Sequence, residues 1–432
     1  MDKNRRIAYL TLMDVESKQA YSNLALNHHI NSGKPDAPAF VRELVYGVLE
    51  NKIYLDYIIE QYIKTPVCKM KSSDRIVLRM GIYQLKFLDG VPEYAAVNES
   101  VDMAKKYCRG REGFINGVLR SFLRAGKEVE LPDRAKDEVY YLSVKYSYEP
   151  WIIELWMEQY ATDFVEELLA AGNKTPDLVA RVNFLKTTRD DLKRRIIAKG
   201  YRAEDGLLCK EALHLEGRGL LSGRLYNSGM FSIQDESSML AVNMLDPQSD
   251  EMIIDVCAAP GGKSLAIAEK MNNRGMVSAW DIYKRKLSII EKEAQRLGVT
   301  IITTRTWDAT RVDSSMIEKA DRVLVDAPCS GLGVVRRKPE IKYKKKSKDI
   351  DELPRKQLAI LSASSKYLKP GGTLVYSTCT ISPYENQQVV KDFLKKNPGF
   401  SKEEELQLLP NINNTDGFFI CKMKKDECLI CE

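Results

Sequence analysis

The sequence predicts a multidomain chain in which an all-α domain comes first, a small α+β domain second and an α/β domain with a doubly wound parallel sheet last. Three observations predict this order. The chain has 432 residues, about three domains at roughly 150 residues each. Apolar residues recur at helical spacing through the first part, and apolar strands alternate with helical stretches from about residue 236. We place the domains at residues 1–135, 138–235 and 236–432.

The first domain is predicted to be helical because its apolar residues recur three and four positions apart. The stretch 40–49 places Val41, Leu44, Val45 and Val48 on one helical face. The same pattern recurs over residues 74–87, 98–107 and 113–123, and Pro132 lies in a linker.

The middle domain mixes the two kinds of element. We expect one helix over residues 151–169, a strand over 177–183 and a charged helix over 188–199, followed by short segments between glycines. This alternation indicates a small α+β domain of roughly 90 residues.

The last domain alternates regularly, which predicts βαβ units and a parallel sheet. Such sheets bind ligands at the carboxyl ends of their strands, so the residues that follow each strand are the candidates for chemistry. The expected strands are residues 252–256, 275–280, 301–306, 322–325 and 373–376.

Composition excludes several classes of protein. Sixty-six Lys and Arg against sixty Asp and Glu leave a net charge of +6, which permits a polyanionic partner without requiring one. Three histidines argue against a Ser-His-Asp hydrolase or a His-rich metal site, so we expect no metal. Nine cysteines with no secretory segment and no apolar run of about 20 residues indicate reduced thiols, a cytoplasmic location and no membrane span.

Three strand ends carry residues that suit a nucleoside cofactor. The first expected strand runs into Asp255-Val-Cys-Ala-Ala-Pro-Gly-Gly-Lys-Ser264, a small-residue loop that is neither G-x-G-x-x-G nor a Walker loop. A tight turn explains a bare Gly-Gly equally well. Asp281 and Asp308 follow the next two strands, where carboxylates hold ribose hydroxyls or an adenine amino group. Each alone fits a helix N-cap better, but two in register with the loop favour a cofactor.

Two further strand ends carry cysteines. Asp326-Ala-Pro-Cys329 follows the fourth expected strand, and Ser377-Thr-Cys379 follows the fifth. A single pocket cysteine is usually a small core residue, whereas a pair at successive strand ends indicates thiol chemistry. Between them, residues 336–348 hold eight basic side chains. Such a run is most often solvated surface, but beside a pocket it predicts phosphate binding.

Together these motifs, in this order and spacing, resemble the RNA 5-methylcytosine methyltransferase family over residues 236 to about 424. The stretches Tyr94–Val101 and Gly113–Arg120 look like a helical NusB-type RNA-binding domain. Within the family, that domain joined to a ferredoxin-like domain is typical of the bacterial small-subunit rRNA enzymes. The resemblance therefore implies a Rossmann-like methyltransferase domain, a 16S rRNA substrate and the cytosine designated 967 as its target.

The resemblance also implies roles for single residues. The chemistry requires one thiolate to attack the cytosine ring and a second group to assist release, and the residues alone do not say which cysteine attacks. DNA cytosine methyltransferases would nominate Cys329; the RNA family nominates Cys379 as nucleophile and Cys329 for release, and we follow it. Asp326 is expected to contact the cytosine and supply a proton. S-adenosylmethionine is expected to contact Cys257, Ala258, Ala259, Pro260, Gly261, Gly262, Lys263, Asp281, Asp308 and Asp326.

We expect RNA to contact the basic run through Arg336, Arg337, Lys338 and Lys342, and the protein to act as a monomer. The N-terminal helices offer a second basic face, with solvated helix charge as an equal alternative, made of Lys105, Lys106, Arg109, Arg111, Arg120 and Arg124. Gln387 stands where the family often has Glu, a small departure. Cys428 and Cys431 have metal-like spacing without a second ligand pair. An oxidoreductase, a non-catalytic ribosome-assembly factor and the same chemistry on another nucleic acid are the alternative functions.

Overall fold

The computed structural model describes residues 1–217, 219–347 and 349–427, which form two compact units. The first contains residues 1–174 together with residues 335–346. The second contains residues 175–334 and the chain from 347 onward. The predicted boundaries at 135/138 and 235/236 stay predictions, because the two units divide the chain at other places.

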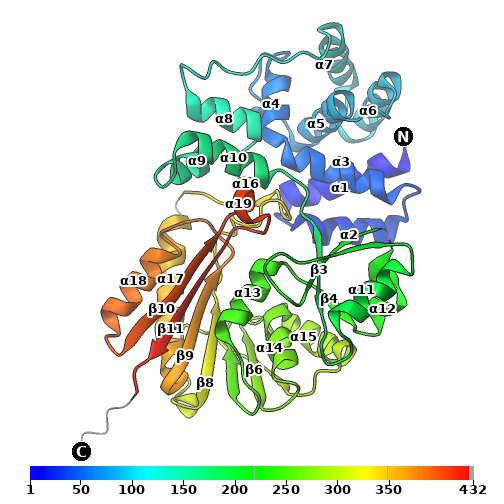
Figure 1. The fold of residues 1–432 in the computed structure, drawn as a ribbon. Coiled ribbons are helices and arrows are strands. Elements are labelled where there is room, and N and C mark those ends of the chain that lie inside the picture. Colours follow the sequence, from blue (N-terminus) through cyan, green and yellow to red (C-terminus); the bar gives the residue numbers. More distant parts are fainter. Residues whose placement is uncertain (218, 348, 428–432) are drawn as a thin grey trace, which may run out of the picture. The chain divides into compact units, whose positions relative to one another are not determined.

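The first unit is helical around one apolar core (Figure 1). The helices predicted over 40–49, 74–87, 98–107 and 113–123 are confirmed as α3, α5, α6 and α7. Their apolar residues at spacings of three and four lie inside; Val41, Leu44 and Val45 of α3 are fully buried. The helices are α1 (Lys3–Ser17), α2 (Ser22–Gly33), α3 (Pro38–Glu50), α4 (Lys52–Glu60), α5 (Ser72–Phe87), α6 (Glu93–Tyr107), α7 (Glu112–Arg124), α8 (Glu138–Tyr146), α9 (Pro150–Met157) and α10 (Thr162–Gly172), with the 3-10 turn η1 (Val67–Lys69).

The prediction of a single helix over residues 151–169 is wrong. The structure has two helices there, α9 and α10, separated by a turn at residues 158–161. Ala161 is extended, with φ −62° and ψ 151°, so the helical hydrogen-bond ladder stops before Thr162 starts the next helix. Asp163 then lies in the first turn of α10, where an acidic side chain is favourable.

One short segment joins the helical unit from far along the sequence. Residues 335–346, which we call the anchor segment, contain α16 (Ile341–Lys344) and follow a strand of the second unit. Glu340 is buried and accepts hydrogen bonds from the Ser22 backbone N–H (2.9 Å) and hydroxyl (2.7 Å). Lys342 is fully buried, and its ammonium donates to the Glu50 carbonyl (2.9 Å) and to Asn173 Oδ1 (3.0 Å). The segment is thus built into the helical unit by buried polar contacts.

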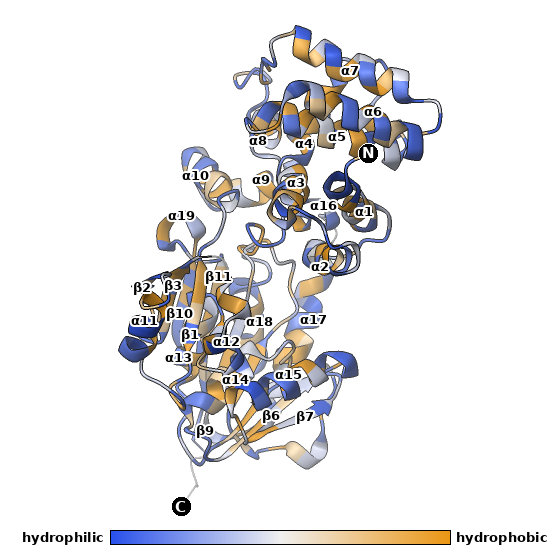
Figure 2. Cartoon of the chain, turned by 90° about the vertical axis from the view of Figure 1, so that its right-hand side faces the viewer, coloured by the Kyte–Doolittle hydropathy of each residue, from blue (hydrophilic) through white to orange (hydrophobic). Residues whose placement is uncertain are grey.

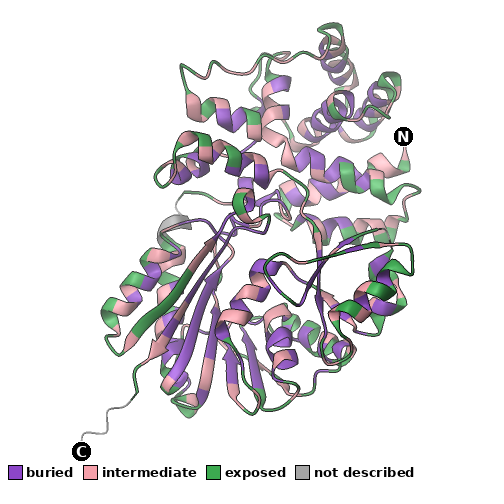
Figure 3. Ribbon diagram, in the orientation of Figure 1, coloured by how far each residue is buried: buried purple, intermediate pink, exposed green. Residues whose placement is uncertain are grey.

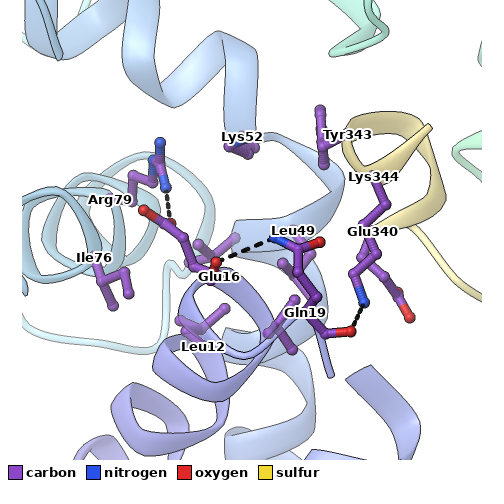
Figure 4. A pocket seen from close by; sticks show the side chains of 12 residues that line it. Leu12, Glu16, Gln19, Leu49, Lys52, Ile76, Arg79, Glu340, Tyr343 and Lys344 are labelled. Carbon is purple, nitrogen blue, oxygen red and sulfur yellow. Dashed lines mark hydrogen bonds and ion pairs between the residues drawn. The ribbon is translucent and has the colours of Figure 1, made fainter. Parts of the chain in front are cut away.

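Figure 4 shows a small cavity of ≈ 80 Å³ where the anchor segment meets α1 and α3. Lys344 donates to the Gln19 carbonyl across 2.8 Å. Arg79 of α5 is buried and donates to Glu16 Oε2 (2.6 Å). Tyr343 donates to the Ser147 carbonyl (3.0 Å). These charged and polar side chains at the junction therefore each have a hydrogen-bond partner, because a buried polar group without one would be destabilising.

The anchor segment makes stability depend on pH. Burial lowers the pKa of Lys342 to about 7, opposed by the nearby Glu50 carboxylate. In an unfolded chain the pKa of lysine is about 10.4. Between these values the unfolded state holds a proton that the folded state has released, so the free energy of unfolding rises with pH.

We expect Lys342→Met to flatten this rise by about 2 kcal/mol between pH 7 and 9. Urea unfolding of wild type and variant at both pH values measures it. Burial raises the pKa of Tyr148 and Tyr343 and of Glu50, the titratable groups facing the ammonium, so the tyrosines stay neutral over this range. Parallel pH profiles for the two proteins would contradict the prediction.

The second unit begins with a small antiparallel sheet of strand order β2-β3-β1-β4. With its helices it runs β-α-β-β-α-β, the ferredoxin-like arrangement. The strand and the helix predicted over 177–183 and 188–199 are confirmed as β1 and α11, and Thr188 caps α11 by accepting from the Asp191 N–H. The elements are β1 (Leu178–Val182), α11 (Arg189–Ile197), β2 (Arg202–Asp205), β3 (Ala212–Glu216), η2 (Leu220–Ser222), α12 (Arg224–Asn227) and β4 (Phe231–Ile233).

The larger sheet has seven strands in the order β10-β11-β9-β8-β5-β6-β7. Strands β5 to β9 are mutually parallel and match the five predicted strands, whereas β11 and β10 add an antiparallel edge that the sequence analysis did not predict. In Figure 3 the central strands are buried and β10 is largely exposed. The strands are β5 (Met252–Asp255), β6 (Met276–Asp281), β7 (Ile302–Thr306), β8 (Ala320–Asp326), β9 (Leu368–Thr378), β10 (Phe400–Leu408) and β11 (Phe418–Lys425).

Helices cover both faces of this sheet. One apolar core lies between the sheet and α13, α14 and α15, and the other between the sheet and α17 and α18. Figure 2 shows hydrophobic residues on the inner strand β6 and hydrophilic ones on β7 at the edge. The Rossmann-like architecture is thereby confirmed. The remaining elements are α13 (Glu236–Leu245), α14 (Gly262–Lys270), α15 (Lys284–Leu297), η3 (Ser314–Met316), α17 (Asp349–Ser364), η4 (Ser365–Tyr367), α18 (Gln387–Lys396) and α19 (Pro410–Asn413).

Candidate active site

The small-residue loop lies where the direction of winding of the sheet reverses. The chain runs outward from β5 through β6 to β7 and then returns to β8 on the other side of β5. Open α/β sheets bind their ligands at such a switch point. The loop 256–261 leaves β5 and enters α14, and Gly261 has φ +107° with Ile290 so close that a Cβ would meet it at 2.8 Å. Glycine is therefore required for this tight entry into the helix.

An arginine of the ferredoxin-like domain supports this loop. Arg181 on β1 is buried and donates to the Gly262 carbonyl (2.8 Å) and to Gln234 Oε1. Its guanidinium also pairs with Glu269 of α14 (2.9 Å). Sequence analysis missed Arg181, because a single arginine within a short apolar strand gives no local signal of what it supports.

Of the two predicted cofactor carboxylates, Asp281 ends β6 and Asp308 follows β7. Asp281 Oδ1 accepts the Tyr283 N–H (2.8 Å), and no described residue donates to its Oδ2. Asp308 Oδ1 accepts the Thr310 N–H (3.0 Å) and hydroxyl (2.7 Å), which keeps the pKa of Asp308 below its usual range. Asp281 thus retains an acceptor for sugar hydroxyls, as an adenosyl cofactor requires. Asp308 already uses one of its oxygens to stabilise the turn at Thr310.

Beneath the loop lies a buried carboxyl group. Asp255 ends β5 and accepts the Ser264 hydroxyl on Oδ2 (2.6 Å), while its Oδ1 has no hydrogen-bond partner. Burial raises the pKa of Asp255 to about 7. Burial beside Asp255, Asp326 and Asp281 also raises the pKa of the Cys257 thiol well above its ordinary value. Small residues, an orphaned carboxyl oxygen and Asp281 at one switch point therefore fit the adenosyl and amino-acid parts of S-adenosylmethionine.

A lysine–aspartate pair bridges the switch point. Lys263 Nζ in the first turn of α14 lies 2.7 Å from Asp326 Oδ2 at the end of β8. The Ser377 hydroxyl donates to the other oxygen, Oδ1 (2.9 Å). Burial alone lowers the pKa of Lys263, but the charges of Asp326, Cys379 and Asp255 raise it above the ordinary value. The ammonium is therefore held charged beside the two cysteine-bearing strand ends.

The two predicted cysteines are brought together. Cys329 Sγ and Cys379 Sγ are 3.3 Å apart, a thiol contact well beyond the roughly 2.05 Å of a disulfide. The hydrogen bond with Cys379 and burial raise the pKa of Cys329 well above its ordinary value, and the Glu385 and Asp326 carboxylates act in the same direction. Cys329 is thus held as a protonated thiol that can donate to the Cys379 sulfur.

A buried glutamate links the two cysteine loops. Glu385 is fully buried and accepts from the Ser330 N–H (2.8 Å) and hydroxyl, one residue after Cys329. The Thr380 hydroxyl, one residue after Cys379, reaches the same carboxylate (3.5 Å). One side chain thereby holds both loops.

Further buried amides complete this support. Gln357 of α17 donates to Glu385 Oε2 (2.9 Å) and to the Pro328 carbonyl (3.0 Å). Asn386 donates to the Thr380 carbonyl (3.1 Å). These roles were missed, because only the adjacency of Glu385 and Asn386 to the last motif signalled them. Gln387 begins α18, outside this bridge.

Not all of the side chains predicted to contact RNA in the basic run are accessible. Lys342 cannot meet a phosphate, because its ammonium is buried against Glu50 and Asn173 inside the helical unit; that prediction is wrong. Arg336 is also buried. Lys338 lies over the Tyr21 ring at 5.6 Å, and the contacts expected of Arg337 and Lys338 stay predictions.

The described residues hold neither a metal-ligand cluster nor a helix suited to cross a membrane. No three His, Cys, Asp or Glu side chains among them group as a metal site would need. None of their helices combines the length and apolar character of a membrane span. Cys428 and Cys431 lie outside the residues that the structure describes.

Family models match three parts of the chain. A model described as 16S rRNA methyltransferase RsmB/F matches residues 242–424. The NusB family matches residues 2–124, and a ferredoxin-like domain of RsmF/B-type methyltransferases matches residues 148–220. The three expected domain types are thereby confirmed.

Curated relatives match nearly the whole chain. The probable ribosomal RNA small subunit methyltransferase B of Bacillus subtilis (strain 168) is 41% identical, covering 98% of each chain. That of Synechocystis sp. (strain PCC 6803) is 34% identical over 98% of this chain and 99% of its own. The crystal structure of PH0851 shares the fold, with a TM-score of 0.84, 24% identity and coverage of 98% of this chain and 99% of that one. The resemblance seen in the motifs is confirmed, and the chain belongs to the ribosomal RNA small subunit methyltransferase B family.

Proposed function

We propose that this protein methylates C5 of one cytosine in small-subunit ribosomal RNA, the position designated 967 in 16S rRNA, through a covalent bond between Cys379 and C6 of the base. The cofactor, S-adenosylmethionine, supplies the methyl group from its positively charged sulfonium. The observation that carries the proposal is the thiol pair Cys379 and Cys329, 3.3 Å apart beside the Lys263–Asp326 ion pair.

The chemistry explains why two thiols are needed. Cytosine C5 is a poor nucleophile, and addition of the Cys379 thiolate to C6 makes C5 an enamine carbon. A C5–methyl bond then forms as the methyl–sulfonium bond breaks. Loss of the C5 proton to water re-forms the C5–C6 double bond and expels the Cys379 sulfur, which the Cys329 thiol 3.3 Å away stabilises by a hydrogen bond as it leaves.

The protonation pattern supports this division of roles. The hydrogen bond with Cys379, together with burial and the nearby carboxylates, raises the pKa of Cys329, and a thiol is a poorer nucleophile than a thiolate. The charged Lys263 ammonium interacts with Cys379 and favours its thiolate. Cys379 is then the attacking group, and Cys329 is the donor that assists release.

Asp326 is proposed to hold the cytosine N3/N4 edge. Its oxygens are held by Lys263 and Ser377, so the carboxylate is fixed at the end of β8 before a base arrives. Fixed acceptors lose little entropy on binding. The Lys263–Asp326 pair also offers a path for the proton that N3 gains when C6 is attacked.

The substrate base has to leave its stack to reach these thiols, so a loop or flipped nucleotide is expected. The relatives' names support a ribosomal RNA substrate. We propose that the protein acts on it in the cytoplasm and as a monomer.

Bisulfite sequencing of total RNA tests the proposal. RNA from cells lacking the gene, from complemented cells and from cells complemented with the Cys379→Ala variant is compared. We expect one small-subunit cytosine to resist conversion only when the unmodified protein is present. An unchanged small-subunit RNA refutes the substrate, and a new unprotected site in transfer or large-subunit RNA would identify another one.

A further inference from the structure

The helical unit contains a cavity of ≈ 370 Å³ that none of the chemistry above uses. Two loops form it. One runs from Ile63 to Lys71 between α4 and α5, and the other holds Arg109 and Arg111 between α6 and α7. Its volume lies within the range of small-molecule binding sites.

Its walls carry an excess of positive charge. Lys64, Lys69, Lys71, Arg109 and Arg111 line it. The acidic residue Asp74 is buried and pairs with Arg111 (3.4 Å). Arg111 also lies over the Phe114 ring at 4.2 Å, so its guanidinium is held from two sides.

The other four cations of the cavity have no acidic partner among the described residues. They are Lys64, Lys69, Lys71 and Arg109. Some other basic side chains of this unit do have acidic partners. Lys105 lies 2.8 Å from Asp102, and Lys127 lies 2.9 Å from Glu93. Like charges gathered without counter-charges repel one another, so an anion that entered the cavity would relieve this repulsion.

Two helix N-termini add to the positive potential. α5 and α7 begin at the cavity, and their N-cap residues, Lys71 and Arg111, make no side-chain capping bond. The N-terminus of a helix carries partial positive charge and unsatisfied N–H groups that favour phosphate. Unpaired cations and two such termini thus converge on one cavity from loops far apart in the sequence.

We propose that this cavity binds backbone phosphates of the substrate RNA, away from the methylated base. The inference rests on the proposed function and adds a second contact for the same RNA. Phosphate contacts fix the register of a nucleic acid without reading its bases. The same oxyanion chemistry is found in free phosphate compounds, which the experiment distinguishes.

The test neutralises the cavity with Lys69→Gln, Lys71→Gln and Arg109→Gln together. The matched control removes three cations of the same unit that lie outside the predicted basic face and already have acidic partners, as Lys18→Gln, Lys127→Gln and Arg134→Gln. Binding of a small-subunit RNA fragment containing the target cytosine is measured at several KCl concentrations, and methylation kinetics are measured with the same fragment.

Each lost phosphate contact lowers the slope of log K against log salt by about 0.7 for single-stranded RNA. We expect the cavity variant to lose about 2 units of slope, to bind more than about 10-fold more weakly at low salt and to raise KM with kcat unchanged. The control should keep a wild-type slope. Equal slopes for the two variants would overturn the proposal.

Further arms separate the remaining outcomes. If the triple variant fails to fold by circular dichroism, Lys69→Gln alone is expected to lose about 0.7 units of slope. Thermal stabilisation of wild type by inorganic phosphate, with an unchanged RNA slope in the variant, would identify a free phosphate compound as the occupant and overturn the RNA assignment. A wild-type protein that binds the fragment but does not methylate it would overturn the proposed function. The salt dependence of RNA binding by the cavity variant would still decide whether the cavity binds phosphates.

Discussion

Replacing Cys379 with alanine is expected to lower methylation by more than about 10³-fold, with RNA and cofactor affinity within a few-fold of wild type. Without its sulfur no bond to C6 forms, and C5 stays a poor nucleophile. Transfer of a labelled methyl group to the RNA fragment gives the rate, and calorimetry gives the affinities. A variant that keeps wild-type methylation would exclude Cys379 as the nucleophile.

The partner cysteine is expected to give the opposite signature. Cys329→Ala leaves the attacking sulfur in place but removes the thiol 3.3 Å away that assists release, so a protein–RNA adduct should accumulate. Denaturing gels of enzyme, labelled RNA and S-adenosylmethionine reveal it. The double variant Cys329→Ala/Cys379→Ala is the control and should show none. An adduct formed by Cys379→Ala and not by Cys329→Ala would exchange the two roles.

Removing the Glu385 carboxylate is expected to cost both activity and stability. Glu385→Ala leaves the Ser330 N–H and the Gln357 amide buried without their acceptor, and the cysteine loops lose their common support. Breaking such a buried charged network costs about 3–5 kcal/mol. We expect kcat to fall about 100-fold with little change in KM, because a small displacement of the reacting groups is enough.

Glu385 acts through the cysteines, so stability alone is not a sufficient readout. Glu385→Gln keeps the size and one acceptor and should recover most of the stability and part of kcat. Glu404→Ala, an exposed glutamate on β10, is the matched control. Adduct formation in a Cys329→Ala background should slow with Glu385→Ala. An unchanged rate of adduct formation would reduce Glu385 to a role in stability only.

The parallel strands could be predicted because each is a short apolar run bounded by turn residues. The chemistry then lies where strand ends have to meet, as Asp326 and Cys379 do. In the antiparallel edge, β11 is a buried apolar run that was overlooked, whereas β10 could not be predicted in this way. β10 carries Lys402 and Glu403 to Glu405 on an exposed edge, and without a buried face a strand leaves no apolar pattern.

The support around the thiols was beyond prediction for another reason. Ser330, Gln357 and Thr380 meet at Glu385 only after three elements have packed, and no spacing in the sequence encodes that meeting. Lys342 shows the reverse case. A lysine within a basic run is usually solvated, yet tertiary contacts with Glu50 and Asn173 bury it.

The anchor segment has a consequence for how the protein is made. The helical unit takes most of its residues from the start of the chain, but residues 335–346 belong to it as well. During synthesis, residues 1–174 emerge from the ribosome long before Glu340 and Lys342 are added to the chain. A fragment that stops at residue 174 therefore leaves the Glu50 carbonyl and Asn173 Oδ1 without the Lys342 donor. Completion of the first unit to emerge is thus timed by the synthesis of the second.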